Sequence, residues 1–183
     1  MGKNLLGILY MLLSVTFFSL MDILVKVTDE YAVGQILFFR ASFGFIPIFF
    51  LIPKDRLRNF YKTKRISLHF WRSAFGAVAM AAIFIALRNL ELAETVAMTF
   101  AGPIFVTLFS IFFLSEKVRA TRWSAVIIGF IGVIFISRPG FETMNYYYVF
   151  PIIFCLGFAA VCIIIRKLTL HGENVWLIAF YFT

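Results

Sequence analysis

Most of the chain is divided into apolar blocks, and short charged stretches separate them. About twenty helical residues are needed to cross the hydrocarbon core of a bilayer. Six blocks have roughly this length and a seventh begins; they cover residues 5–25, 34–52, 68–87, 95–114, 123–137 and 147–165, with 175–183 opening the seventh. Lipid cannot satisfy free backbone polar groups, and the alternation of a barrel strand is absent, so the blocks must be helices. We therefore expect an all-α fold, a polytopic transmembrane helical bundle.

The composition excludes a soluble domain. Of the 183 residues, 62% are hydrophobic and only 14% are charged, whereas soluble domains are about half apolar and about a quarter charged. A net charge of +8 would suit a nucleic-acid-binding protein only if the basic residues formed a patch on a folded surface. All but two of the 17 lie outside the apolar blocks instead, so we expect no nucleic-acid partner.

The basic loop residues also predict the orientation of the chain. Short loops on the cytoplasmic side of a membrane are enriched in Lys and Arg. Counting alternate loops places twelve on one side and three on the other; the twelve are Lys3, Lys54, Arg56, Arg58, Lys62, Lys64, Arg65, Lys117, Arg119, Arg122, Arg166 and Lys167, and the three are Lys26, Arg88 and Arg138. We therefore expect a multi-pass protein of the cytoplasmic (inner) membrane with a cytoplasmic N-terminus. The cluster at 54–65 can also hold anionic lipid headgroups, which makes membrane lipid an expected partner.

No pattern of an enzyme or of a metal site is present. Cys155 and Cys162 lie seven residues apart inside an apolar block, which is not the spacing of a metal or redox pair. His69 and His171 stand alone, and the sequence contains no HExxH, GxSxG or P-loop pattern. We expect no enzymatic activity, no metal, no cofactor and no use of ATP.

The sequence contains a weak internal repeat. Sliding residues 10–42 onto residues 151–183 aligns the apolar runs and brings several identical residues together, namely Phe17 with Phe158, Ile23 with Ile164, Lys26 with Lys167, Thr28 with Thr169 and Phe39 with Phe180. A repeat of five spans is odd in number, so its second copy must be inverted in the membrane, as in many transporters. We predict a first five-helix repeat over residues 1–140 and the start of a second, inverted repeat over residues 141–183. We also expect the sequence to be truncated.

Two segments in the middle of the chain resemble a known family. Residues 92–118, LAETVAMTFAGPIFVTLFSIFFLSEKV, resemble the fourth-helix signature of the EamA family, and residues 122–140, RWSAVIIGFIGVIFISRPG, resemble its fifth helix. The resemblance covers essentially the whole chain and implies the drug/metabolite transporter superfamily. It implies ten helices in two inverted five-helix repeats, both termini in the cytoplasm and a central substrate cavity. The segments FFRA at 38–41 and HFWR at 69–72 are similar to the S-adenosylmethionine uptake branch.

The resemblance implies a secondary transporter that moves a small-molecule metabolite by alternating access between its repeats. Coupling to a proton or another ion and facilitated exchange both remain open, as do the substrate and the direction of transport. One alternative is a non-transporting membrane scaffold, and another is the remnant of a truncated carrier. If the chain is complete at residue 183, we expect a homodimer of oppositely oriented copies.

Three ionisable residues inside the apolar blocks are candidates for substrate binding, because such residues usually face a bundle interior or an aqueous path. Asp22 lies about one turn from the outer end of the first block, and its alternative role is an ion pair with Lys26 four residues later. Arg40 can pair with Asp22 or with a substrate carboxylate. Arg72 lies near the cytoplasmic end of the third block, where its side chain can also extend back to the interface.

The fourth block adds two polar candidates, Thr99 and Pro103. Pro103 lies near the middle of the block and removes one backbone donor, which leaves the carbonyl of Thr99 unpaired within the membrane. Together with Thr95 and Thr107, these residues form a polar stripe at the depth where carriers bind substrates. The alternative is a simple helix kink in which threonine hydroxyls satisfy the free backbone groups.

Overall fold

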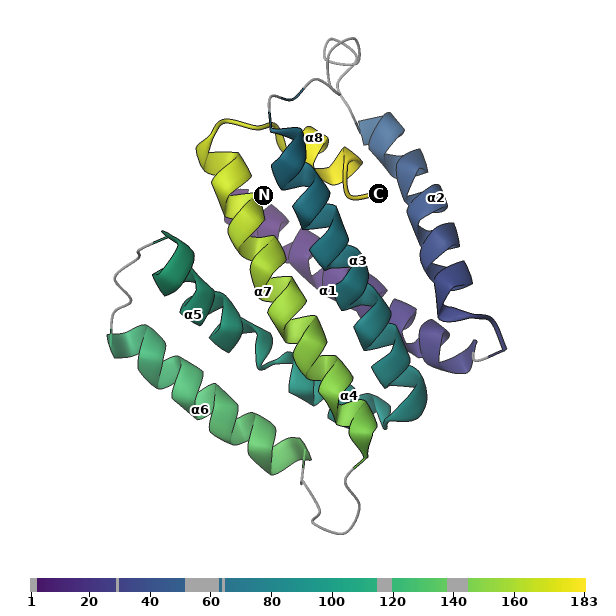
Figure 1. The fold of residues 1–183 in the computed structure, drawn as a ribbon, viewed down its shortest axis with the longest axis vertical. Helices are drawn as coiled ribbons and strands as arrows, with labels where there is room; N and C mark the ends of the chain where they lie inside the picture. Colours follow the sequence, from purple (N-terminus) through teal and green to yellow (C-terminus); the bar gives the residue numbers. More distant parts are fainter. Residues whose placement is uncertain (1–2, 29, 52–62, 64, 115–119, 138–144) are drawn as a thin grey trace.

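The computed structural model describes residues 3–28, 30–51, 63, 65–114, 120–137 and 145–183, and within these ranges the chain forms helices and no strands. In chain order the elements are α1 (Lys3–Val27), α2 (Val33–Leu51), α3 (Ile66–Asn89), α4 (Leu92–Thr99), α5 (Gly102–Leu114), α6 (Ala120–Ser137), the short 3₁₀ turn η2 (Tyr146–Tyr148), α7 (Val149–Leu170) and α8 (Val175–Phe180) (Figure 1). The described part of the chain contains four segments that are long and apolar enough to cross a membrane, Leu5–Val27, Ile66–Asn89, Leu92–Leu114 and Tyr146–Leu170. The predicted all-α bundle is confirmed.

The predicted blocks correspond to helices except in one place. The block at 95–114 was expected to be one helix with a kink, but it consists of α4 and α5, separated by a turn at Phe100 and Ala101. Pro103 is the second residue of α5. The first N–H groups of a helix have no intrahelical acceptor, so a proline that lacks this donor fits best at a helix start. The proline therefore begins a new helix instead of bending a continuous one.

The centre of the bundle is the long contact between α3 and α7, with α5 packed along another side of α7 (Figure 1). The helices approach closely because the residues at the crossing are small. Gly157 of α7 lies against Ala79 of α3, and a Cβ built on the glycine would be 2.8 Å from the Cβ of Ala79. Ala159, two residues further along α7, is fully buried. This crossing fixes α3, which carries more residues of the site described below than any other helix does.

Two reciprocal caps hold the ends of α1 and α3 together. The Lys26 ammonium donates to the carbonyls of Leu87, at 3.0 Å, and Leu90, at 2.7 Å. The Arg88 guanidinium donates to the carbonyl of Thr28 at 2.7 Å. The last carbonyls of a helix have no intrahelical donors, and cations are favourable at this end of the helix dipole. Lys26 therefore caps a neighbouring helix and does not form the alternative ion pair with Asp22.

Two further hydrogen bonds join chain segments at opposite ends of the bundle. Tyr148, just before α7, donates to the Glu94 carboxylate in the first turn of α4 at 3.0 Å, and α4 follows directly after α3. At the opposite end of the bundle, the Thr63 hydroxyl donates to the Glu173 carboxylate at 2.7 Å. The second bond places Thr63, before α3, and Glu173, after α7, at the same end of the bundle. The prediction that alternate loops lie on the same side of the membrane requires this.

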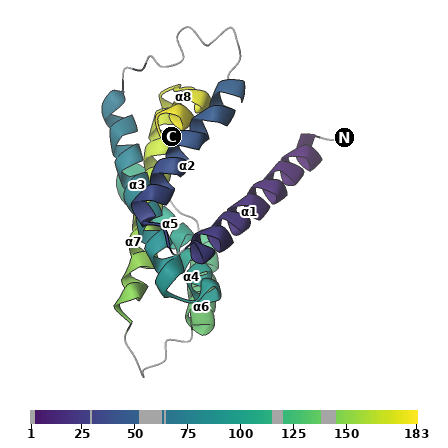
Figure 2. The same ribbon diagram turned by 90° about the vertical axis from the view of Figure 1, so that its right-hand side faces the viewer.

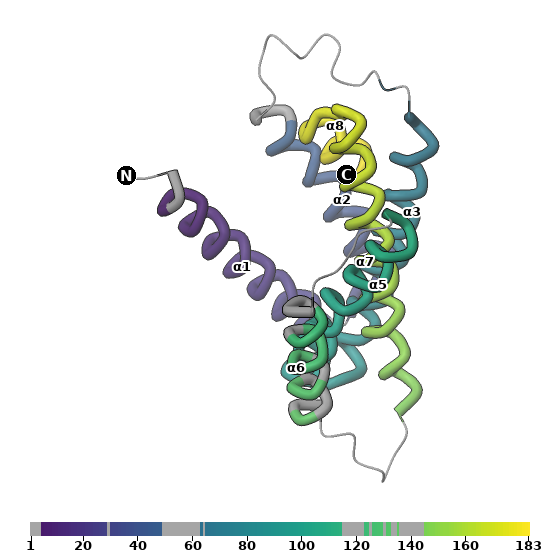
Figure 3. Tube along the Cα trace, turned by 90° about the vertical axis from the view of Figure 1, so that its left-hand side faces the viewer, coloured from purple at the N-terminus to yellow at the C-terminus, as the bar shows by residue number. Residues whose placement is uncertain are grey.

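Helix α1 leaves the bundle at an angle. Figure 2 shows that it touches the other helices at its C-terminal end and extends away from them toward the N-terminus, and Figure 3 shows the same separation from the opposite side. Only 6% of its most apolar window is buried, compared with 33% for the window that contains α7. Most of α1 therefore has no protein partner among the described residues.

Candidate functional site

A cavity of about 300 Å³ lies between α1, α2, α3, α4 and α7, and the residues after α8 close one side of it. Four of the five residues predicted to bind a substrate line this cavity, namely Asp22, Arg40, Arg72 and Thr99. They come from four different helices. The rest of the lining is mainly apolar and contains four phenylalanine rings, Phe18, Phe154, Phe158 and Phe182.

Arg72 is the most deeply buried charge of the site. Its side chain is only 8% exposed, and its Nε and Nη1 atoms have no hydrogen-bond partner in the described residues. The guanidinium carbon lies 4.0 Å from the centre of the Phe182 ring, which is a cation–π contact. The side chain is therefore not extended back to the membrane interface, because the Phe182 ring lies over its guanidinium.

Arg40 of α2 reaches the same phenylalanine. Its guanidinium carbon lies 5.8 Å from the centre of the Phe182 ring. The ring is seated against Gly76 of α3, where any side chain would overlap it. One aromatic ring therefore contacts both arginines, and a glycine provides the room for it. No anionic group is paired with either guanidinium in the part of the chain that the structure describes.

Asp22 also lacks the partners that were considered for it. It is half-buried at the edge of the cavity, and it makes no hydrogen bond or ion pair with the described residues. Lys26 caps α3, and Arg40 contacts Phe182. A carboxylate and two guanidinium groups therefore surround one cavity without neutralising one another. Unpaired charges in a low-dielectric interior are costly, and this arrangement suits a bound molecule that carries groups of both signs.

The break between α4 and α5 lies beside this cavity. The Thr99 hydroxyl donates to the carbonyl of Val96 at 2.7 Å. The Cys155 thiol of α7 lies 3.6 Å from the carbonyl of Met98 and 3.8 Å from that of Thr99, within hydrogen-bond range for sulfur. Both carbonyls therefore face a buried thiol; that of Met98 also accepts the Ala101 N–H at 3.1 Å, whereas that of Thr99 has lost its helical donor at Pro103. Pro103 is exposed and does not line the cavity.

The sequence did not single out the groups that close the site from the side of α8. His69 is 1% exposed, and its ring packs on Tyr181 with the ring centres 4.7 Å apart. The Ser73 hydroxyl donates to the Tyr181 carbonyl at 2.6 Å. Phe182 was missed because nothing in the sequence distinguishes it from the other 24 phenylalanines. Gly76 offered a weak signal, since glycine inside a membrane helix often marks a close contact.

Comparison with known proteins gives consistent matches along most of the chain. A sequence model of the EamA-like transporter family matches residues 5–138. The pseudopaline exporter CntI of Pseudomonas aeruginosa is 27% identical over 179 residues, which is 96% of this chain and 62% of the exporter. The S-adenosylmethionine uptake transporter of Rickettsia felis is 26% identical over 179 residues, which is 96% of this chain and 59% of that transporter. The chain thus spans about six tenths of the length of these relatives. No solved structure matches it.

Proposed function

Because the chain belongs to the EamA-like transporter family, we propose that its intact product is a secondary transporter that carries a small metabolite across a membrane. The cavity between α1, α2, α3, α4 and α7 is the binding site in this proposal. The observation that carries it is the position of Asp22, Arg40 and Arg72 around this cavity with no ion pair among the described residues. A polar molecule that enters the cavity would find partners already placed there. Alternating access then exposes this site to each side of the membrane in turn.

The charges of the cavity define the chemistry of the molecule that fits. A carboxylate or phosphate matches the donors of Arg72 and Arg40, which bind such groups through a fork of N–H donors. A cationic group matches the Asp22 carboxylate. The phenylalanines of the lining provide surfaces for an apolar or planar part. S-adenosylmethionine carries a carboxylate, cationic centres and a purine ring, and it is our first candidate because one of the relatives is named for its uptake.

The proposed location is the cytoplasmic membrane, with the N-terminus in the cytoplasm. The unequal distribution of Lys and Arg between the two sets of loops supports this orientation. The caps between α1 and α3 support the assignment of the loops after these two helices to the same side, since they bring Lys26 and Arg88 to the same end of the bundle. Most of the basic residues that carry the argument lie outside the described residues, namely Lys54, Arg56, Arg58, Lys62, Lys64, Lys117, Arg119 and Arg138.

The two-repeat organisation, with residues 1–140 and 141–183 in different repeats, also remains a proposal. The alignment of 10–42 with 151–183 makes α1 the counterpart of α7 and α2 the counterpart of α8. Helix α7 packs along α3, whereas most of α1 is exposed. A second repeat would supply α1 with the counterpart of α3. Cross-linking cysteines placed on α1 and on that counterpart in the intact product would test this pairing.

Uptake by the intact product tests the proposed function. Purified protein in proteoliposomes should take up labelled S-adenosylmethionine, and Arg72→Gln and Asp22→Asn should each lower uptake about tenfold or more, since charged hydrogen bonds contribute about 1.5–3 kcal/mol. Arg65→Gln is the matched control. Arg65 precedes the same helix, is exposed and does not line the cavity. Its variant should transport like the parent.

Two results would contradict different parts of the proposal. Parent-like uptake by both cavity variants at equal protein amounts would remove the cavity as the site. Correct insertion with no flux of S-adenosylmethionine or of any other zwitterionic metabolite tested would favour a non-transporting membrane scaffold. Flux of another metabolite, lost in Arg72→Gln, would keep the transporter and change only the substrate.

A further inference from the structure

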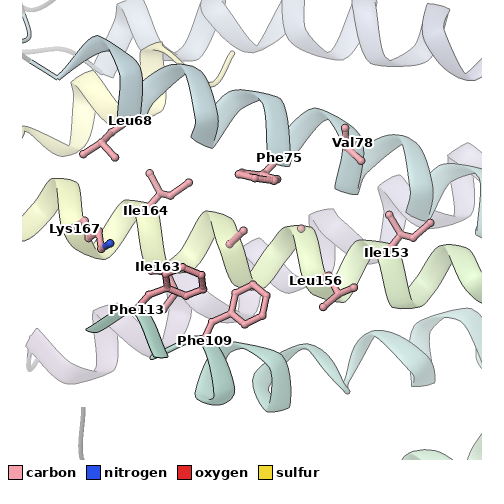
Figure 4. A pocket seen from close by; sticks show the side chains of 12 residues that line it. Leu68, Phe75, Val78, Phe109, Phe113, Ile153, Leu156, Ile163, Ile164 and Lys167 are labelled. Atoms are coloured by element: carbon pink, nitrogen blue, oxygen red, sulfur yellow. The ribbon is translucent and has the colours of Figure 1, made fainter. Parts of the chain in front are cut away.

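A second cavity among the described residues is larger than the charged one. A groove of about 600 Å³ lies between α3, α5 and α7, and its lining is apolar except for one cation, Lys167 (Figure 4). Leu68 of α3 and Phe113 of α5 lie near the Lys167 end, while Val78 and Ile153 lie at the other end. A polar metabolite would find a single partner here. The groove is therefore separate from the proposed transport site in both position and chemistry.

The groove has the length of a lipid chain. Its lining on α7 runs from Ile153 to Lys167, which is about 21 Å of helix at 1.5 Å per residue. This length exceeds the thickness of one leaflet, about half of the 30 Å hydrocarbon core. An extended acyl chain fits such a groove lengthwise, with its head at one end.

The charges at that end are positive. The Lys167 ammonium lies 5.8 Å from the centre of the Phe113 ring, and no carboxylate among the described residues pairs with it. Arg65 is exposed one turn before Leu68, which lines the same end of the groove. The nearby carboxylate of Glu173 accepts the hydroxyl of Thr63. Lys167 also belongs to the more basic set of loops, which faces the anionic leaflet in the proposed orientation.

We propose that this groove binds an anionic phospholipid, with an acyl chain along α7 and its phosphate at the Lys167 ammonium. The inference does not depend on the transport function. Electrostatic attraction between basic pockets and lipid headgroups supplies the preference for an anionic lipid, while the apolar walls hold the chain. The lipid site and the charged cavity thus share α3 and α7, but α5 completes the lipid site, whereas α1, α2 and α4 complete the charged cavity.

A lipid fits the groove better than a further helix does. Helices that pack in membranes meet through small residues, which let their backbones approach. The walls here are mostly large side chains, such as Phe75, Phe109 and Leu156. A helix with its side chains is about 10 Å wide, whereas an acyl chain is thin and adapts to gaps between such groups. A buried lysine would also require an acidic partner on that helix, whereas a phospholipid brings its own phosphate.

Native mass spectrometry of the intact product tests the proposal. The protein is purified in a mild detergent and titrated with phosphatidylglycerol and, separately, with phosphatidylcholine of the same chain length. We expect one tightly retained phosphatidylglycerol and clearly weaker retention of phosphatidylcholine. Lys167→Gln should weaken phosphatidylglycerol binding about fivefold, from about 1 kcal/mol per basic residue. It should weaken phosphatidylcholine binding less, because the choline cation of that lipid offsets the charge of its phosphate. Arg88→Gln, which removes a cation at the other end of α3, should bind like the parent.

A second variant tests the groove without changing any charge. Ala160 lines the groove, so Ala160→Phe should fill it and reduce the retention of both lipids. The matched control is Ala93→Phe, at an exposed position in the first turn of α4. Equal retention of the two lipids by the parent would overturn the proposal, as would parent-like phosphatidylglycerol binding by either groove variant. A parent that retains neither lipid would show that protein covers the groove, and it would overturn the proposal as well.

Discussion

The crossing of α3 and α7 allows one substitution to be predicted in detail. In Gly157→Ala, the new Cβ would lie 2.8 Å from the Cβ of Ala79 and 3.1 Å from the carbonyl oxygen of Phe75. Neither neighbour is the flexible end of a side chain, since one is the first atom of a buried alanine and the other belongs to the backbone. Relief therefore requires α3 and α7 to move apart.

The expected loss follows from two opposing effects. Overpacking a tight contact costs about 1–3 kcal/mol, and replacing glycine with alanine in a helix returns up to about 1 kcal/mol. We expect a net loss of about 1–2 kcal/mol, which lowers the melting temperature by about 2–8 °C for a chain of this size. Thermal unfolding of the purified protein in detergent measures it. Uptake should fall as well, because the same crossing holds Arg72 of α3 and Phe158 of α7, which both line the charged cavity.

Gly102→Ala is the matched control for this prediction. Gly102 is also buried, but a Cβ there would be 3.4 Å from the nearest atom, Cδ1 of Phe158, which is an ordinary van der Waals contact. This variant should melt at the temperature of the parent or slightly above it. If Gly157→Ala is as stable as Gly102→Ala, the close approach of α3 and α7 is not what holds this part of the bundle, and the reasoning fails.

Two other substitutions test contacts beside the charged cavity and at the end of α3. Gly76→Ala should displace the Phe182 ring from Arg72, and we expect a changed KM for uptake with unchanged protein abundance; a KM equal to that of the parent would show that the ring has no role in binding. Lys26→Met removes two donors to carbonyls at the end of α3, so it should lower the free energy of unfolding by about 1–3 kcal/mol; a melting temperature equal to that of Arg65→Gln would contradict this capping role.

The fold was predictable to the extent that hydropathy determines it. An apolar stretch of sufficient length must satisfy its own backbone groups in lipid, so the helices at 5–25, 68–87 and 147–165 follow from the sequence alone. The break in the fourth block does not follow, because hydropathy is the same for a helix and for two short helices in line. Across from the break, Cys155 of α7 faces the carbonyls of Met98 and Thr99. A contact so distant in sequence leaves no local pattern.

The site was partly predictable for a related reason. A charged residue inside an apolar block is easily recognised in the sequence. Asp22, Arg40 and Arg72 were found in this way, and all three line one cavity in the structure. What each charge touches depends on helices that pack from elsewhere in the chain. Arg72 is buried because Phe182, more than a hundred residues later, covers its guanidinium. Interface extension was a reasonable expectation for Arg72 from its position in the block, but only the packing decides it.

We chose the charged cavity over the larger apolar groove as the proposed transport site because of the free-energy cost of its charges, not because of its size. An apolar groove costs a membrane protein little, because lipid chains fill it as readily as side chains do. A charged residue near the centre of a membrane helix costs about 2.5–3.5 kcal/mol on insertion scales. Asp22 and Arg72 lie nearer the ends of their blocks than Arg40 does, so about 8–10 kcal/mol is an upper bound for the three together on that scale, and even part of it is comparable to the whole stability of a typical domain, about 5–15 kcal/mol. Ion pairs among them would reduce this cost, yet the described residues form none. A chain that keeps three such groups unpaired around one cavity is better suited to bind a charged solute than to be stable without one.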